Sequence, residues 1–113
     1  MKRIFILFFS LIISITAFSQ SDIKTEKFKV EGNCGMCKKR IEEAAFVKGV
    51  KRAEWDKQSH ELTVIYRPSK TNTDAIATSI AKAGHSSEKM EAPEKNYKNL
   101  PECCQYKTHV CND

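Results

Sequence analysis

The spacing of apolar side chains changes from a strand period to a helical period after Gly32-Asn33, and this restricts the folds open to the chain. From Glu26 to Glu31 polar and apolar residues alternate, as they do in a half-buried strand. From Gly35 onward apolar residues return at helical spacing and form one stripe, made of Cys37, Ile41, Ala44 and Ala45. Gly49 is predicted to end this helix as a left-handed cap.

Two strands, a second helix and a last strand are predicted downstream. Val50–Asp56 and Glu61–Tyr66 are separated by a short polar turn, which predicts a β-hairpin. The second helix is expected over Thr73–Ala83, with its first residue as the N-cap. Residues 85–91 are expected to form a short, polar edge strand. The order is therefore β-α-β-β-α-β.

This order predicts an α+β fold of the ferredoxin-like βαββαβ type. A three- or four-stranded antiparallel sheet with two helices on one face buries both helical stripes and the inward side chains of the strands. The expected core residues are Phe28, Trp55, Leu62, Val64 and Ile80.

Residues 1–19 have the pattern of a signal peptide. Lys2 and Arg3 precede an apolar run, and the small residues Ala17 and Ser19 predict cleavage before Gln20. An uncleaved anchor is the alternative, but the run is shorter than the roughly 20 residues that span a bilayer. After cleavage 94 residues with a net charge of +3 would remain, in an exported and oxidising compartment. We expect a short leader over residues 20–25.

The length of 113 residues allows one small domain, and a net charge of +5 is too mild to indicate nucleic-acid binding. The sequence shows no Ser-His-Asp set, phosphate-binding loop or paired carboxylates. We therefore expect a protein that is not an enzyme.

A pair of cysteines spaced C-x-x-C marks the turn from the first strand to the first helix. Cys34 falls in the loop and Cys37 in the first helical turn. The helix N-terminus, the charges of Lys38, Lys39 and Arg40, and an exposed loop all favour the thiolate, which is the form that binds metals. Two soft sulfurs suit Cu(I) better than zinc, which prefers four ligands.

Residues 26–92 resemble the heavy-metal-associated (HMA) domain of small copper chaperones, copper-transporting ATPases and the periplasmic mercury-binding protein. The matching stretches are Val30–Cys37, Gly49-Val50 and Ala83–His85. The resemblance implies that Cys34 and Cys37 bind one soft ion, Cu(I) foremost or Hg(II), and pass it on by ligand exchange. It also implies a partner, a metal-transporting membrane protein or another metal-accepting domain, that docks on the basic face of Lys38, Lys39 and Arg40. The alternative is that these three residues are only the solvated start of the helix. We expect a monomer.

Two positions depart from the family pattern. Gly32 stands where the family has a methionine that packs under the loop, which puts the rigidity of the loop in question. His85 stands where an aromatic residue or lysine is common, and it is either an auxiliary ligand, a charge-tuning group or a solvated loop residue. His60, in the hairpin turn, is expected to be solvated.

Residues 93–113 lie outside the resemblance and are expected to form a separate, polar, cysteine-rich tail. The tail contains Cys103, Cys104, His109 and Cys111. Three interpretations stay open: a second metal site, a disulfide from Cys111 to Cys103 or Cys104, or a tail that folds back and supplies a thiol to the Cys34/Cys37 pair.

Two other functions compete with metal transfer. A thiol–disulfide oxidoreductase also places C-x-x-C at a helix start, but thioredoxin-like proteins have more chain before the motif than the single strand found here. A small disulfide-stapled module that binds another protein is the third class.

Overall fold

Strand β3 (Glu61–Tyr66) is the centre of a three-stranded antiparallel sheet, in a computed structural model that describes residues 22–33 and 35–108. It pairs with β1 (Lys24–Lys29) along its whole length and with β2 (Val50–Trp55) across the predicted hairpin. Every second residue of β3 is buried, so one face of the sheet is apolar.

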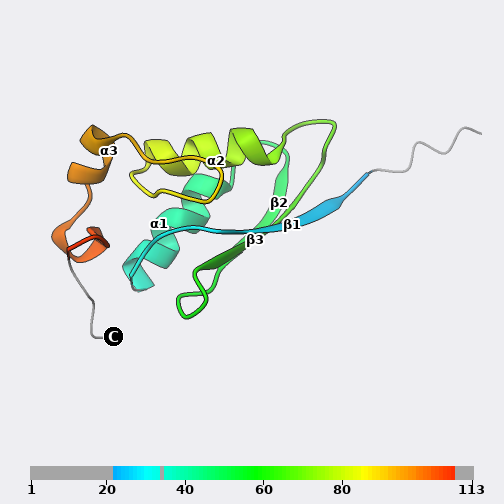
Figure 1. The fold of residues 1–113 in the computed structure, drawn as a ribbon. Coiled ribbons are helices and arrows are strands. Elements are labelled where there is room, and N and C mark those ends of the chain that lie inside the picture. Colours follow the sequence, from blue (N-terminus) through cyan, green and yellow to red (C-terminus); the bar gives the residue numbers. More distant parts are fainter. Residues whose placement is uncertain (1–21, 34, 109–113) are drawn as a thin grey trace, which may run out of the picture.

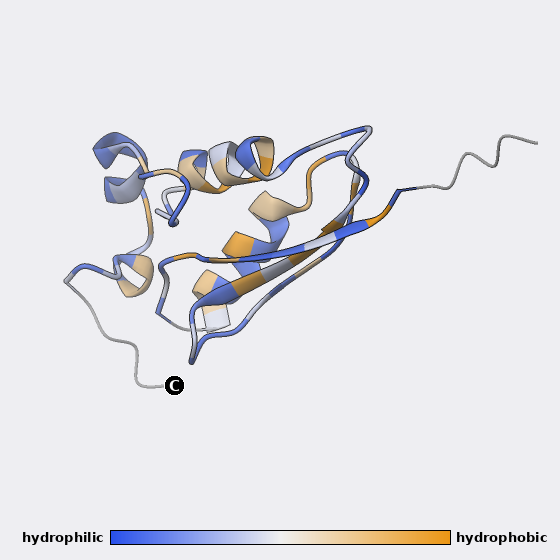
Figure 2. Cartoon of the chain, turned by 45° about the vertical axis from the view of Figure 1, so that its right-hand side comes forward, coloured by the Kyte–Doolittle hydropathy of each residue, from blue (hydrophilic) through white to orange (hydrophobic). Residues whose placement is uncertain are grey.

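Two helices cover this apolar face (Figure 1). Helix α1 (Gly35–Ala45) buries Cys37, Ile41 and Ala45, and α2 (Thr73–Lys82) buries a second stripe, Ile76, Ala77, Ile80 and Ala81. Apolar residues recur along both helices and along the strands (Figure 2). The predicted α+β, ferredoxin-like architecture is confirmed, and all five expected core residues are buried. No helix among the described residues is long and apolar enough to cross a membrane.

The predicted last strand over residues 85–91 is reduced to one bridge between Val30 and Ser87 in the described part of the chain. The backbone turns back directly after this bridge, because the Ser87 amide donates to the Met90 carbonyl oxygen at 2.8 Å. The Ser86 hydroxyl also accepts from the Ala92 amide at 2.8 Å, so side chain and turn replace a continuous ladder.

Helix ends differ from the prediction in two places. Helix α1 ends at Ala45, and Gly49, with a φ of 100°, lies in the turn before β2 rather than at the helix end. Helix α2 is capped by Asn72, not Thr73, since the Asn72 Oδ1 accepts from the Ala75 amide at 2.8 Å. Asn is at least as good a cap as Thr, and its side chain is placed to reach the third residue on.

The described part of the expected tail is not separate from the domain. Residues 93–108 contain α3 (Glu94–Lys98) and a 3₁₀ helix (Glu102–Cys104), and they lie at the end of the molecule where α1 begins (Figure 1). Tyr97, Leu100 and Cys104 are buried in the same core cluster as the helices and the sheet. The Asn96 side-chain amide donates to the Lys82 carbonyl oxygen at 2.7 Å, at the end of α2.

Gly84 is the residue on which this docking depends, and we predict that Gly84→Ala destabilises the protein. Its φ is 102°, and an added Cβ would lie 2.7 Å from the Asn96 carbonyl oxygen and 2.8 Å from the Leu100 Cγ. We expect a loss of about 1–3 kcal/mol in the free energy of unfolding, measured in urea.

Gly35→Ala is the matched control, because nothing lies within 4 Å of an added Cβ there. Its stability should be unchanged or slightly raised, as expected for alanine in a helix. Equal stabilities for the two variants would contradict the role given to Gly84.

Candidate metal centre

Cys37 is fully buried in the first turn of α1, whereas the sequence predicted a solvated thiol. The C-terminal segment covers this end of the helix, in keeping with one of the three interpretations of the tail. Cys34, the other cysteine of the motif, lies outside the described residues. The structure therefore places one of the two predicted ligands at the start of α1.

Trp55 fills the space under the loop that precedes α1. A Cβ on Gly32 would lie 3.1 Å from the Trp55 Cη2, 3.0 Å from the Ile41 Cδ1 and 3.1 Å from the Cys37 Cβ. The Trp55 Nε1 donates to the carbonyl oxygens of Val30 at 3.0 Å and His60 at 3.1 Å. A methionine at position 32 would find no room, so the departure at Gly32 is balanced by a buried indole.

His85 is fully buried. It is therefore not a solvated loop residue, which was one of the three interpretations of this position. Its Nδ1 is 2.8 Å from the Glu31 carbonyl oxygen. A carbonyl oxygen only accepts, so Nδ1 carries the hydrogen and Nε2 carries a lone pair. Within the described part of the chain this Nε2 has no hydrogen-bond partner.

The pKa of His85 is lowered from its usual value, chiefly because burial disfavours the charged ring. The hydrogen bond to Glu31 acts in the opposite direction, and the positive charge of Arg40 lowers the pKa further. His85 is therefore neutral near pH 7.

Tyr106, which the sequence analysis overlooked, covers His85. The two rings stack with centroids 5.7 Å apart, and the Tyr106 hydroxyl donates to the Gly84 carbonyl oxygen at 3.1 Å. The same hydroxyl accepts from the Ser86 amide at 3.0 Å. Tyr97 contacts the edge of Tyr106 with centroids 4.9 Å apart. The helical spacing of Tyr97 and Leu100 was the one signal of this docking in the sequence.

Sulfur atoms from α1 and from the C-terminal segment meet beside the loop. Cys104 is fully buried, and its thiol is within hydrogen-bond reach of the thiols of Cys37 and Cys103. The Cys103 Sγ donates to the Met36 Sδ at 3.4 Å. Burial raises the pKa of the Cys104 thiol well above its usual range, and the neighbouring thiols raise it further. Both Cys37 and Cys104 are thiols rather than disulfides.

A second metal site in the tail has no support in the described residues. His109 and Cys111 lie outside them, and the described residues contain no group of three or more His, Cys, Asp or Glu arranged to hold a metal ion. The described part of the tail folds back toward Cys37, which is the geometry that the third interpretation of the tail requires.

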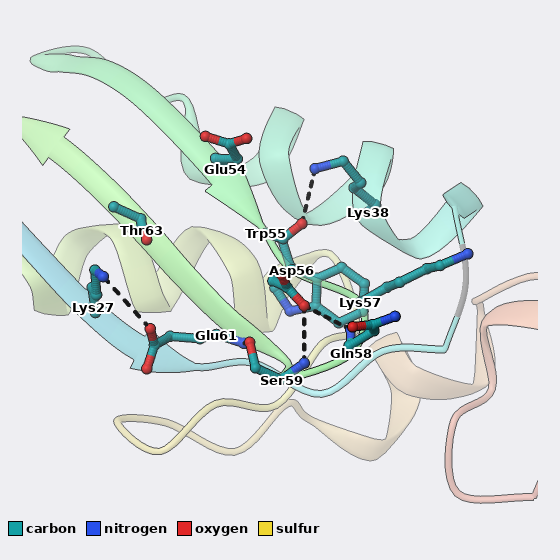
Figure 3. Close-up of a pocket in the computed structure, with 10 residues that line it drawn as sticks. All are labelled: Lys27, Lys38, Glu54, Trp55, Asp56, Lys57, Gln58, Ser59, Glu61 and Thr63. Carbon is teal, nitrogen blue, oxygen red and sulfur yellow. Dashed lines mark hydrogen bonds and ion pairs between the residues drawn. The ribbon is translucent and has the colours of Figure 1, made fainter.

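The three cations of the predicted basic face differ in their surroundings. The Lys38 ammonium pairs with the Glu42 carboxylate at 2.7 Å. It also donates to the Trp55 carbonyl oxygen at 2.8 Å (Figure 3). Lys39 is exposed and Arg40 is half-buried.

The pocket of Figure 3, beside the β2–β3 turn, is lined by lysine, acidic and hydroxyl side chains and, among the described residues, by no thiol. It is not a soft-metal site.

Comparisons with known proteins place this arrangement in a family. No family model and no curated protein matches the chain. Among solved structures, the CopZ metallochaperone is 29% identical with a TM-score of 0.55, over 57% of this chain and 98% of its own. MerP from Ralstonia metallidurans CH34, in its oxidised form, is 23% identical with a TM-score of 0.56, over 59% of this chain and 96% of its own, and supports the fold alone.

The copper ATPase CopA from Bacillus subtilis provides higher identities. Its water-soluble region is 33% identical with a TM-score of 0.56, over 60% of this chain and 46% of its own. A copper form of a CopA variant is 33% identical with a TM-score of 0.52, over 59% of this chain and 91% of its own. The chain therefore belongs to the heavy-metal-associated domain family.

Proposed function

We propose that the protein binds one soft metal ion through Cys34 and Cys37 and passes it to a partner by thiolate exchange. The observation that carries the proposal is the position of Cys37, in the first turn of α1 in a heavy-metal-associated fold. Backbone N–H groups at a helix start stabilise a thiolate, and thiolates are the ligands that Cu(I) prefers. We take Cu(I) as the ion and Hg(II) as the alternative.

Export of the protein is part of the proposal. The charged and apolar pattern of residues 1–19 supports a signal peptide that is cleaved before Gln20. The protein would then act in the periplasm or outside the cell, as a monomer without stable membrane insertion. Its role would be a chaperone or a scavenger, not an enzyme.

The partner we propose is a metal-transporting membrane protein or another metal-accepting domain. Exposed Lys39 and half-buried Arg40 supply positive charge beside the loop and would steer an acidic partner toward it. Lys38 contributes less, because Glu42 already pairs with it at 2.7 Å.

His85 would support the site without adding charge. It is neutral, buried and held by Glu31, and its Nε2 lone pair makes it the alternative to a further thiol as an auxiliary ligand.

The central prediction is that the purified protein binds one Cu(I) per chain and that the double variant Cys34→Ser/Cys37→Ser loses it. Removing both thiolates leaves hard oxygen donors, which bind Cu(I) poorly. Native mass spectrometry of the reduced protein, loaded with Cu(I), Zn(II) or Hg(II), measures the stoichiometry.

The double variant Cys103→Ser/Cys111→Ser removes the same number of thiols and should keep the ion. Undiminished Cu(I) binding by Cys34→Ser/Cys37→Ser would refute the proposal. Rapid reduction of insulin by the wild-type protein would favour an oxidoreductase instead.

A second prediction concerns pH. Because the folded-state pKa of His85 is lowered, the unfolded chain binds more protons below the unfolded-state pKa of about 6.5. The stability of the metal-free protein should therefore be fully present above that pH and fall as the pH decreases below it. The contribution of His85 to this slope is at most about 1.4 kcal/mol per pH unit.

The variant His85→Asn isolates this contribution, since an amide can still donate to the Glu31 carbonyl oxygen but does not titrate. Urea unfolding between pH 7.5 and 5.5 should give a flatter dependence for the variant than for the wild type. Equal slopes in the two proteins would contradict the buried, neutral histidine.

A further inference from the structure

The C-terminal segment is fixed to the loop before α1 and to the first turn of α1. On one side the Asn33 side-chain amide donates to the Cys103 carbonyl oxygen at 3.4 Å. On the other side the Cys103 Sγ donates to the Met36 Sδ at 3.4 Å. Asn33 directly precedes the C-x-x-C motif and Met36 lies within it, so the segment is anchored at the place where the ion is proposed to bind.

Cys104 is the residue that this anchoring brings inward. The 3₁₀ turn is closed by a hydrogen bond from the Cys104 amide to the Pro101 carbonyl oxygen at 2.8 Å. Its side chain is fully buried and reaches the Cys37 thiol, whereas Cys103 stays partly exposed at the rim. Two adjacent cysteines thus have different surroundings.

A buried cysteine alone would be ordinary, because cysteine packs as a small hydrophobe. Here a second, independent arrangement accompanies it: two buried thiols from distant parts of the sequence lie in one core cluster, within hydrogen-bond reach of each other, at the start of α1. Soft ions bind thiolates in preference to other ligands, and the paired thiols of Cys37 and Cys104 can provide two of them.

We propose that Cys104 supplies an additional thiolate to the soft ion that Cys37 binds. The inference rests on the proposed function and extends its ligand set beyond the C-x-x-C motif. On binding, the Cys104 S–H bond breaks, its proton leaves to solvent and a sulfur–metal bond forms, with no change of oxidation state. Cys103 remains at the rim beside Met36.

An additional thiolate changes what the site does. A two-thiolate site leaves room for the thiol of a partner to attack the ion, whereas a third sulfur occupies that position. The C-terminal segment therefore favours retention of the ion, and transfer requires Cys104 to be displaced from it. This arrangement fits a scavenger or a regulated donor better than a freely exchanging carrier.

The test counts sulfur neighbours. X-ray absorption of the purified protein with one equivalent of Cu(I), reduced without added thiols, should show three sulfur atoms around copper. Cys104→Ala should show two, and competition with a Cu(I) chelator should show at least a tenfold loss of affinity. The matched control Cys103→Ala removes the neighbouring thiol and should keep three sulfurs.

Native mass spectrometry of the same samples must give one chain and one ion, so that a dimer sharing copper is recognised. If Cys104→Ala does not fold, Cys104→Ser replaces it, because serine is close to cysteine in size. The number of sulfur atoms around copper in the wild-type protein tests the inference even without a variant. Two sulfurs in the wild type would overturn the inference, as would two sulfurs with one nitrogen, which would assign the third position to His85. A wild type that binds no Cu(I) would refute the proposed function instead.

Discussion

The Trp55 indole is the contact on which the rest of the structure depends. Its Nε1 joins the end of β1 to the β2–β3 turn by donating to the carbonyl oxygens of Val30 and His60. Its backbone amide donates to Glu42 on α1 at 2.8 Å, and His60 stacks on its ring with centroids 5.5 Å apart. One buried residue thus fixes strand, turn and helix relative to each other, the first two through its indole and the helix through its backbone amide. His60 is part of this contact and not simply solvated. The loop that leads into α1 packs against this buried indole.

The periodic elements were predictable because each has its own repeating signal. β3 has the predicted bounds, and Ile41 and Ala45 of the predicted helical stripe are buried as expected. The fourth strand was not predictable, since its length is decided by hydrogen bonds of Ser86 and Ser87 rather than by apolar alternation. A hydroxyl that accepts from a backbone amide a few residues away competes locally with a ladder.

The surroundings of the candidate site were harder to predict, because they come from a segment with few apolar residues. The sequence of residues 93–108 is mostly polar, yet Tyr97 and Leu100 are buried and Tyr106 covers His85. This docking is non-local, and it uses hydrogen bonds to backbone atoms that no side-chain pattern records, such as the one from Tyr106 to Gly84. The C-x-x-C spacing located the motif, but it did not indicate that Cys37 would be covered.

Covering Cys37 makes the C-terminal segment part of any transfer step. A partner that accepts the ion by ligand exchange must bring its own thiol to the site, and the Cys37 side chain is fully buried beneath this segment. The segment consists of a short helix and a 3₁₀ turn, and it is held by the buried side chains of Tyr97, Leu100 and Cys104 and by side-chain hydrogen bonds rather than by strand pairing. Such segments open at lower free energy than the strands and helices of a core. Opening of this segment, and not unfolding of the domain, is therefore the conformational step that would make the ion accessible to a partner.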